Sequence, residues 1–456
     1  MADNKAMERI EKLLDAGSFV ELGALVTSRV TDFSLQDQAE PSDGVITGYG
    51  QIEGSPVYVY SQNRDVLNGT IGEMHAKKIT DLYDKAMRTG APVIGLIDCG
   101  GFRLQESVDA LDAFSKVLER QILCSGELLM ISAVFGTCAG GMTLVPALSD
   151  FTFLTKDAQM FVNAPHTVTD NTSMARDPAP AVYQNEVAGL AEMLDTEDEV
   201  IEKIRSLILM FENDMYGSSS PSDLNRFIDA DRIAEHTDTR TLLRECADNG
   251  EFLEICPACH PEMVTGFMRL NGILVGVAGN APALFDDTGE IEKELPKGLT
   301  AGGCEKASRL ITFCSQADIP VLTVAAADGF ARVEDTEKNL PAALADMMRA
   351  LARLPKARVG LIIGDTYGSA YLAMNARPLW NGTSMILAWD QVKVGMMEAE
   401  KAANILFAKD ADKERRESDF ESKQNSVLSA AAHGNIDLVI DPKETRKHLI
   451  MAFSML

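Results

Sequence analysis

Short apolar runs alternate with stretches of helical periodicity along most of the chain. The runs in the first half are rich in β-branched and aromatic residues, as is typical of buried strands, and they cover 55–63, 92–101, 128–136 and 151–156. Between them, 71–90 and 111–126 carry apolar residues at helical spacing and end in glycine. The chain opens on another amphipathic stretch that stops at a glycine. This alternation predicts an α/β fold in which helices pack on sheets.

The second half of the chain repeats the pattern of the first. Three segments match earlier ones in the same order: 271–280 matches 54–63, 319–334 matches 91–106, and 357–374 matches 128–145. The second match lies at an offset of 228 residues, and the third is shifted by one residue more. The period is far too long for a solenoid repeat. We therefore expect two tandem domains related by internal duplication, at 1–235 and 236–456. The seam lies near 217–250, where 217–223 has the composition of a linker.

The composition is that of a globular and strongly acidic protein. Across 456 residues, 68 acidic and 42 basic side chains give a formal charge of −26. This argues against nucleic acid or an anionic membrane as a partner, since both attract a basic face. No apolar run approaches the roughly 18 residues of a membrane-spanning helix, and no signal peptide opens the chain. The eight scattered cysteines are therefore expected to be reduced thiols in a cytoplasmic protein.

Glycine-containing turns follow apolar strands at three places. Two of them are 98–103 and 136–141, and 365–371 occupies the duplicated position in the second half. A glycine at a strand-to-helix turn leaves backbone N–H groups open toward a ligand and favours negative charge there. The alternative is that these glycines only allow tight packing of strand and helix. The turns of the first half match neither a dinucleotide fingerprint nor a P-loop, so they do not predict nucleotide binding.

The turns and the segments around them resemble a known family. The stretches GVITGYGQIEG, GEMHAKKI, GAPVIGLIDCGG, GTCAGG, PALSDFTF and GNIDLVIDPKETR occur in this order. They resemble the carboxyltransferase subunit of biotin-dependent acyl-CoA carboxylases and decarboxylases, of the propionyl-CoA carboxylase beta and methylmalonyl-CoA carboxyltransferase type. The resemblance implies two crotonase-like (ClpP/crotonase) domains in a homo-oligomer, commonly a hexamer. It places the acyl-CoA on the N-terminal domain of one subunit and carboxybiotin on the C-terminal domain of another.

The resemblance also implies a site built mainly from backbone N–H groups. Gly140 and Gly141 match the positions that hold the thioester oxygen, while Ser369 and Ala370 match those that hold the biotin ureido oxygen. The other substrate-side candidates are Gly100, Gly101, Arg103, Cys138, Ala139, His166 and Lys77. The other carrier-side candidates are Gly329, Phe330, Tyr367, Gly368 and Leu372. Arg103, Lys77 and Lys78 are candidates for the CoA phosphates, because a chain this acidic must concentrate positive charge there, with solvated surface as the alternative for either lysine.

The implied cofactor is biotin on a separate carrier chain. No methionine in this chain is followed by lysine, as the biotin attachment motif requires. We expect a biotin carboxyl carrier protein as a partner. A biotin carboxylase, a membrane decarboxylase pump subunit and a paralogous subunit are further candidates.

Several segments depart from the family pattern, mostly on the carboxybiotin side. The family's PGFLPG, GGIIRHGA-like and YGGAYD segments are replaced here by 328–333, 340–345 and 367–372, and 163–182 lacks the family's GGA…H pattern. Two alternatives therefore stay open beside a carboxyltransferase. One is a biotin-independent acyl-CoA decarboxylase of the same fold, and the other is a non-catalytic structural partner of an active paralogue.

Three further signals are expected to be structural. Cys256–His260 spells CxxCH, but no second ligand cluster accompanies it, so we expect a loop rather than a haem or metal site. His75, on the helical stretch 71–90, is expected to be a buried and hydrogen-bonded histidine. The charged run at 408–423 is expected to be a solvated helix face, with partner docking as the alternative.

Overall fold

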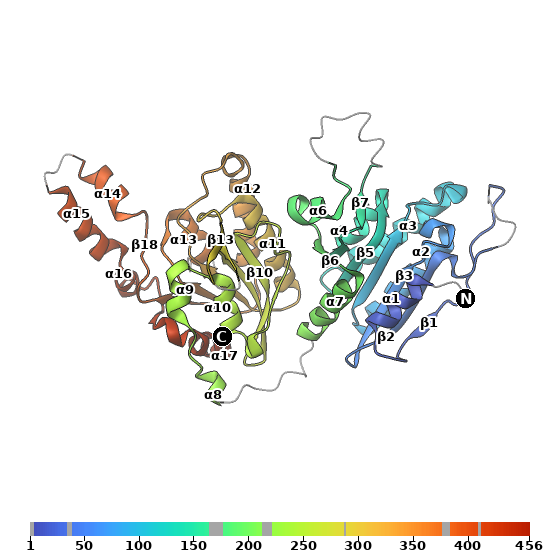
Figure 1. Ribbon diagram of the computed structural model, residues 1–456, viewed down its shortest axis with the longest axis horizontal. Helices are drawn as coiled ribbons and strands as arrows, with labels where there is room; N and C mark the ends of the chain where they lie inside the picture. Colours follow the sequence, from blue (N-terminus) through green and yellow to red (C-terminus); the bar gives the residue numbers. More distant parts are fainter. Residues whose placement is uncertain are drawn as a thin grey trace. The chain divides into compact units, whose positions relative to one another are not determined.

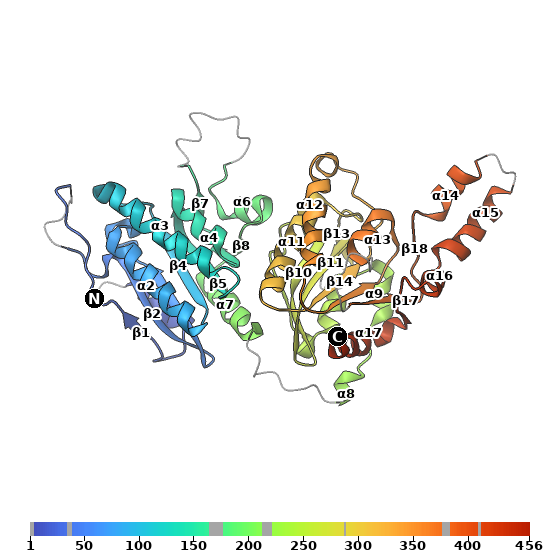
Figure 2. The ribbon, with the colours of Figure 1, turned by 180° about the vertical axis from the view of Figure 1, so that it is seen from behind.

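The computed structural model describes residues 4–33, 39–163, 177–211, 221–286, 289–375, 384–408 and 412–456. The chain divides into two compact units, Met1–Glu212 and Asn213–Leu456, called unit 1 and unit 2 below. Each is built of helices packed on a β-sheet (Figures 1 and 2). Unit 2 begins earlier than the domain boundary expected after residue 235, because Ile228, Ala230 and Ile233 are buried in its hydrophobic core.

Unit 1 is built on a sheet whose strands follow the order β1-β2-β3-β4-β5-β6-β8, with β7 paired to β5. Neighbours from β1 to β3 are antiparallel, and neighbours from β3 to β8 are parallel. Every residue of β4 is buried, as expected of a central strand covered on both faces. The strands are β1 (Val20–Leu22), β2 (Val45–Ile52), β3 (Ser55–Gln62), β4 (Val93–Cys99), β5 (Met130–Ala139), β6 (Phe151–Thr155), β7 (Gln159–Phe161) and β8 (Glu192–Leu194).

Helices cover both faces of this sheet. α2 (Glu73–Thr89) and α3 (Ser107–Cys124) lie in front in Figure 2, whereas α1 (Lys5–Leu13) and α7 (Glu197–Phe211) lie in front in Figure 1. α2 ends at Gly90, whose φ of +73° provides the left-handed cap that favours glycine. The strands and helices predicted for this half are thus found within a few residues of their expected bounds. The shorter helices are α4 (Leu144–Leu148) and α6 (Ala181–Tyr183).

Unit 2 contains a sheet with the same order of strands and the same directions. Its strands run β9-β10-β11-β14-β15-β17-β19, antiparallel from β9 to β11 and parallel from there on. These strands are β9 (Phe252–Glu254), β10 (Met263–Leu270), β11 (Ile273–Asn280), β14 (Val321–Ala325), β15 (Arg358–Ile362), β17 (Ser384–Trp389) and β19 (Leu438–Ile440). Two small pairs lie outside this sheet: β12 (Ala283–Phe285) with β13 (Ile291–Glu294), and β16 (Thr366–Tyr367) with β18 (Val394–Gly395).

Individual contacts repeat at the offset of 228 residues found in the sequence. An isolated parallel bridge joins Ile71 to Phe102 in unit 1, and its counterpart joins Leu299 to Phe330 in unit 2. The same offset relates two pairs in the central strands: Val93 with Met130, and Val321 with Arg358. These repeats are consistent with the expected internal duplication.

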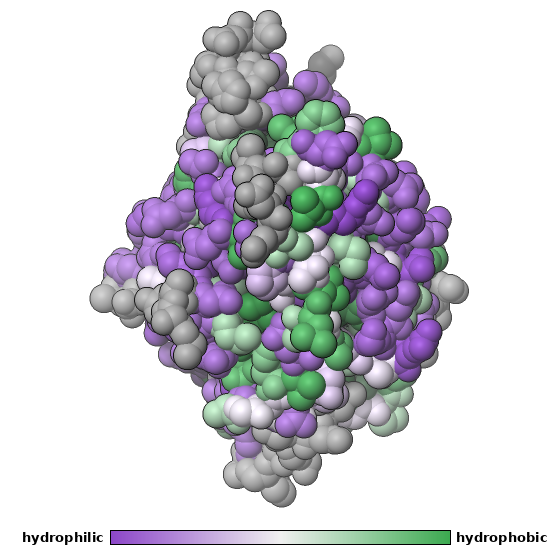
Figure 3. Space-filling model, turned by 90° about the vertical axis from the view of Figure 1, so that its right-hand side faces the viewer, coloured by the Kyte–Doolittle hydropathy of each residue, from purple (hydrophilic) through white to green (hydrophobic). Residues whose placement is uncertain are grey.

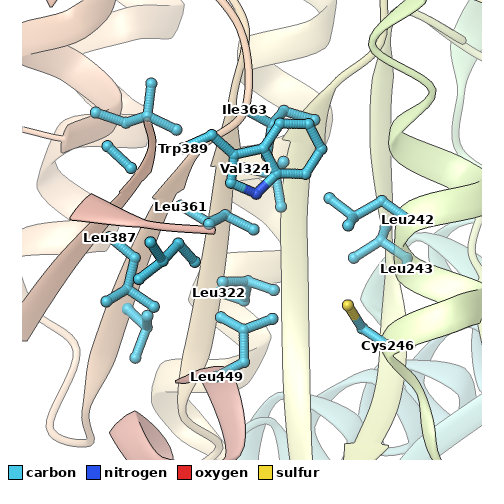
Figure 4. Packing of buried hydrophobic residues seen from close by; sticks show 14 of the residues in the cluster. Leu242, Leu243, Cys246, Leu322, Val324, Leu361, Ile363, Leu387, Trp389 and Leu449 are labelled. Carbon is cyan, nitrogen blue, oxygen red and sulfur yellow. The ribbon is translucent and has the colours of Figure 1, made fainter. Parts of the chain in front are cut away.

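The core of unit 2 lies between its sheet and two helices, α10 (Thr239–Cys246) and α17 (Thr445–Met455). In Figure 4, Leu242 and Leu243 of α10 and Leu449 of α17 lie near apolar residues of the central strands, and Trp389 belongs to the same cluster. The indole of Trp389 is fully buried, and its Nε1 donates a hydrogen bond of 2.9 Å to Oγ1 of Thr445. The polar edge of the ring is therefore satisfied inside the core. The remaining helices are α8 (Pro221–Leu224), α9 (Ala230–His236), α11 (Ala301–Gln316), α12 (Glu334–Ala352), α13 (Gly368–Asn375), α14 (Ala399–Leu406), α15 (Lys413–Phe420) and α16 (Val427–Ala432).

The surface matches two further expectations. α15, in the charged run, buries none of its residues, as a solvated helix should. Within the described ranges, no helix combines the length and the apolar character needed to cross a membrane. On the side of unit 1 seen in Figure 3, hydrophobic side chains gather among hydrophilic ones. α3 exposes Val108 and Leu111 near its start and Ile122 near its end.

Candidate functional site

In unit 1, the two glycine turns expected from the sequence lie side by side at the carboxyl ends of β4 and β5. Cys99 pairs with Cys138 where these parallel strands end. A Cβ placed on Gly101 would lie 3.8 Å from the carbonyl oxygen of Ala139. Residues far apart in the sequence meet there because parallel strands present their carboxyl ends at one edge of a sheet. The structure thus brings together the predicted residues Gly100, Gly101, Cys138, Ala139, Gly140 and Gly141.

The second of these turns presents the backbone N–H groups of Gly140 and Gly141. β5 ends at Ala139, and a 3-10 turn (Gly140–Thr143) leads directly into α4. The first N–H groups of a helical segment have no acceptor within it, so they can bind a ligand oxygen. Gly140 has a φ of +62°, and nothing lies within 4 Å of a Cβ built on it. A ligand can therefore approach the turn closely from the side of Gly140.

Unit 2 repeats this arrangement at the ends of β14 and β15. A bridge between Asp328 and Tyr367 joins the two turns, and Gly368 has a φ of +59° where α13 begins. Ser369 is exposed and Ala370 is buried, and both lie in the first turn of α13. Their N–H groups therefore have no acceptor within the helix. The predicted carrier-side residues share this region: Gly329 and Phe330 follow β14, whereas Tyr367, Gly368 and Leu372 belong to β16 and α13.

A pocket of about 400 Å³ in unit 2 includes residues of these turns. Its titratable lining residues are Glu235, His236, Glu294, Lys297, Asp328, Asp365, Tyr367 and Glu398. Burial and the neighbouring Glu398 raise the pKa of Asp328, whereas a hydrogen bond from Lys401 lowers the pKa of Glu398. Carboxylates outnumber cations on the walls, so the pocket favours neutral or cationic groups over anions.

The structure gives Arg103 a different role from the one expected. Its side chain is 4% exposed and forms ion pairs with Asp43 and, at 2.8 Å, with Glu106. Nη2 also donates a hydrogen bond of 2.7 Å to the carbonyl oxygen of Thr70. Burial raises the pKa of Asp43, and the Arg103 guanidinium opposes that rise. Arg103 therefore neutralises two buried carboxylates, and its donors do not face a CoA phosphate.

His75 is the buried, hydrogen-bonded histidine that the sequence predicts. Its Nδ1 lies 2.9 Å from the carbonyl oxygen of Asp43, and its Nε2 lies 3.1 Å from the amide nitrogen of Gln62. Since the carbonyl can only accept, Nδ1 carries the proton and Nε2 accepts from the amide. Burial lowers the pKa of His75 to about 3, so the ring is neutral.

The remaining substrate-side candidates differ in accessibility. Lys77 is exposed on α2 and stays a candidate for the CoA phosphates, whereas Lys78 is buried and donates a hydrogen bond of 2.6 Å to the carbonyl oxygen of Val45. Burial lowers the pKa of Lys78 to about 8. The thiol of Cys138 is fully buried and its pKa is raised well above the usual value, so only its backbone can meet a ligand. His166 lies outside the described residues.

The sequence pattern does not reveal one cation at this edge of the sheet. Arg64 follows β3, and its half-exposed side chain donates from Nη1 to Oγ1 of Thr137 at 2.9 Å. The same Nη1 lies 3.6 Å from Asp98, a carboxylate shared with Arg9 at 3.6 Å. Arg64 therefore places an accessible guanidinium beside the end of β5. The buried Arg103 cannot offer its guanidinium to a ligand there. The available signal is Asp98 itself, an acidic residue near the end of an otherwise apolar strand.

The CxxCH stretch is a connection, as expected. It joins β9 to β10, and neither its cysteines nor the other six form a disulfide. Nδ1 of His260 lies 3.4 Å from Glu262. Across the described ranges, no group of three or more His, Cys, Asp or Glu side chains could hold a metal ion.

Comparison with known proteins identifies the family. The carboxyl transferase domain model matches residues 3–456. The putative propionyl-CoA carboxylase beta chain of Bacillus subtilis (strain 168) is 37% identical, with 99% of this chain and 90% of that protein covered. Methylmalonyl-CoA decarboxylase subunit alpha of Veillonella parvula is 34% identical, with 99% and 89% covered.

A solved structure has the same fold over almost the whole chain. It is transcarboxylase 12S, described as a hexamer assembly with methylmalonyl-coenzyme A and methylmalonic acid bound. Its TM-score is 0.86 at 30% identity, with 99% of this chain and 89% of that chain covered. The match supports the expected crotonase-like α/β fold. Taken with the duplicated glycine turns, the family match and the relatives show that the chain belongs to the carboxyl transferase domain family.

Proposed function

We propose that this chain is the carboxyltransferase component of a biotin-dependent complex. It is an enzyme that moves a carboxyl group between biotin on a separate carrier and a small acyl-CoA. Relatives named for propionyl-CoA and methylmalonyl-CoA support the substrate class. The observation that carries the proposal is the duplicated turn, since each unit has helical N–H groups, led by Gly140 or Gly368, at the carboxyl edge of its sheet. The N–H groups of each turn can donate hydrogen bonds to one carbonyl oxygen.

Unit 1 supplies the thioester side of the reaction. When the α-carbon of an acyl-CoA loses a proton or a carboxyl group, negative charge develops on the thioester oxygen. The N–H groups of Gly140 and Gly141 can donate to that oxygen, and their donation strengthens as the charge grows. They therefore lower the barrier more than they tighten substrate binding, and one such donor typically contributes about 3 kcal/mol. Arg64 and Lys77 offer positive charge to the CoA phosphates.

Unit 2 supplies the carrier side. The N–H groups of Ser369 and Ala370 suit the ureido oxygen of biotin, which is a neutral acceptor. When bound, biotin supplies the nitrogen that takes up or releases the carboxyl group. Ser369 keeps the backbone donor of the glycine that the family has there, while its exposed side chain narrows the approach. The exposed Leu372 makes the neighbouring surface apolar.

We also propose that the chain forms a homo-oligomer, a hexamer like that described for transcarboxylase 12S, and that it works with a biotin carboxyl carrier protein. The apolar side chains that α3 exposes, Val108, Leu111 and Ile122, support association, because exposed apolar surface is commonly covered by a partner. Light scattering of the purified chain at micromolar concentration should give the mass of a hexamer. A monomer would contradict this part of the proposal.

A biotin-independent acyl-CoA decarboxylase of the same fold is the second candidate. The carboxylate-rich pocket of unit 2 favours it, because Asp328, Asp365 and Glu398 disfavour an anionic carboxylated ligand nearby. This candidate needs the unit 1 turn but not the carrier.

One assay separates the two candidates. Purified chain is mixed with methylmalonyl-CoA and a biotinylated carrier domain, and propionyl-CoA is measured by chromatography. The same carrier domain without biotin is the matched control. Product that requires the biotinylated form supports the carboxyltransferase, and equal product with either carrier supports the second candidate. No thioester turnover and no thioester binding by calorimetry would contradict both.

A further inference from the structure

The ring of Phe102 covers one side of the turn that presents Gly141. A Cβ built on Gly141 would lie 2.7 Å from Cζ and 2.8 Å from Cε2 of that ring. The space that a side chain at position 141 would need is therefore already filled. On the other side of the turn, a Cβ built on Gly140 meets nothing within 4 Å. The turn thus has one open side and one side closed by an aromatic ring.

Phe102 is held in place from two directions. Its backbone lies between two hydrogen bonds, from the N–H of Ile71 to the carbonyl of Gly101 at 2.9 Å and from the N–H of Arg103 to the carbonyl of Ile71 at 2.9 Å. Its ring packs edge-on against Phe114 of α3, with ring centroids 5.0 Å apart and an interplanar angle of 64°. Phe114 is only 4% exposed, so the support is part of the core. A ring anchored in this way cannot swing aside freely when a ligand binds.

Phe102 also reaches the surface, since its side chain is partly exposed. It therefore lies between the buried core and the solvent side of the turn, next to the N–H groups proposed to hold the thioester oxygen. A rigid aromatic wall next to an oxygen-binding turn limits the size of the group that fits beside the oxygen, and pockets of this kind distinguish substrates by single methylene groups.

We propose that Phe102 is a specificity-determining residue that restricts the chain to small acyl groups by closing the Gly141 side of the thioester site. This inference rests on the proposed function. The ring accommodates malonyl- and methylmalonyl-sized groups and excludes larger substituents on the α-carbon. Shortening the side chain opens the space next to Gly141 and admits them.

The test compares thioester selectivity in Phe102→Ala, Phe102→Leu and the unmodified chain. The substrates are malonyl-, methylmalonyl- and ethylmalonyl-CoA, each with the biotinylated carrier domain, and the readout is the ratio of kcat/KM for ethylmalonyl-CoA to that for malonyl-CoA. We expect the ratio to rise roughly 10-fold in Phe102→Ala and by less in Phe102→Leu. Leu104→Ala, an exposed change in the same segment, should leave the ratio unchanged.

The outcomes distinguish this inference from the proposed function. Thermal unfolding of each variant shows whether it is folded, and Phe102→Leu keeps the test valid if the alanine variant unfolds. If a folded Phe102 variant has a kcat/KM ratio within twofold of that of the unmodified chain, the inference is overturned. Turnover by the unmodified chain in the same experiment still supports the proposed function. If the unmodified chain neither turns over nor binds any of the three thioesters, the proposed function fails and the inference fails with it.

Discussion

Gly140 and Gly368 adopt the same left-handed conformation, with φ values of +62° and +59°, at corresponding places in the two units. Gly140 directly follows β5, whereas Gly368 follows β15 and the short β16, and each opens a helical segment. The two glycines lie at the offset of 228 residues found between the halves of the chain. The backbone conformation of the turn is therefore the same in both units even where the side chains differ.

We expect Gly141→Val to reduce kcat for methylmalonyl-CoA by about 100-fold or more while changing KM little. A Cβ at this position lies 2.7 Å from the ring of Phe102, so the turn must shift and its N–H groups lose their alignment. Steady-state kinetics with the biotinylated carrier domain measures the effect. Gly90→Asn, at the left-handed cap of α2, is the matched control and should keep normal kcat. Unchanged kcat in Gly141→Val would remove Gly141 from the oxyanion site.

We expect Arg103→Gln to destabilise the protein by about 3–5 kcal/mol, because it leaves the buried Asp43 and Glu106 without their cation. Urea unfolding measures the change. Arg64→Gln is the matched comparison, since Arg64 is half exposed. The Arg64→Gln variant should shift the urea midpoint of unfolding no more than an ordinary surface substitution does. It should raise KM for acyl-CoA several-fold. An Arg103→Gln protein of normal stability would contradict the structural role assigned to this residue.

We expect His75 to make the protein sensitive to acid. Burial lowers its pKa to about 3 in the folded state, whereas an unfolded histidine titrates near pH 6.5. Between these values the unfolded state binds one more proton, so the free energy of unfolding falls as the pH falls below 6.5. The free energy of unfolding of the unmodified chain should therefore approach that of His75→Gln as the pH falls. The difference between the two free energies should shrink by about 1.4 kcal/mol per pH unit in this window. Urea unfolding at several pH values measures it, and a constant difference would show that the ring is not buried neutral.

We expect the double variant Ser369→Gly and Leu372→Asp to react faster with free biotin than the unmodified chain. Ser369 is exposed and narrows the approach to the N–H groups of α13, and Leu372 replaces a charge with an exposed apolar side chain. Methylmalonyl-CoA decarboxylation with added free biotin should be slow in the unmodified chain and roughly 10-fold faster in the variant. Robust turnover of free biotin by the unmodified chain would show that these departures are harmless. No gain in the variant would favour a non-catalytic role for unit 2.

Hydrophobic periodicity predicts most of the fold because it records which faces are buried. The fully buried β4 appears in the sequence as a continuous apolar run, and the α2 helix ends at Gly90 where its period ends. Matching segments in the same order also anticipate the two similar sheets. The boundary between the units is less predictable, because Ile228 and Ile233 join the second core from short helices that follow the linker-like stretch.

The site divides into a part that the sequence predicts and a part that it does not. Parallel strands bring the glycine turns together, so their meeting at one edge follows from the fold class. The environment of a charged side chain does not follow from the fold class, because its partners come from positions far away in the sequence. Arg103 is buried by Asp43, sixty positions earlier, whereas Arg64 stays half exposed although it lies close to Asp98. The sequence around Arg103 and Arg64 does not identify either partner, and only Asp98, acidic within an apolar strand, signals that a cation lies nearby.

The most direct test of the central claim is transfer of an isotopically labelled carboxyl group from methylmalonyl-CoA to a biotinylated carrier domain by the purified chain. Either form of the carrier is recovered through the same affinity tag immediately after mixing, and the label bound to it is counted. We predict that label accumulates on the carrier in the presence of the chain, that it does not accumulate on the carrier domain without biotin, and that Gly141→Val slows its appearance by about 100-fold. Release of the label only as free CO2, at the same rate with either carrier, would contradict the account.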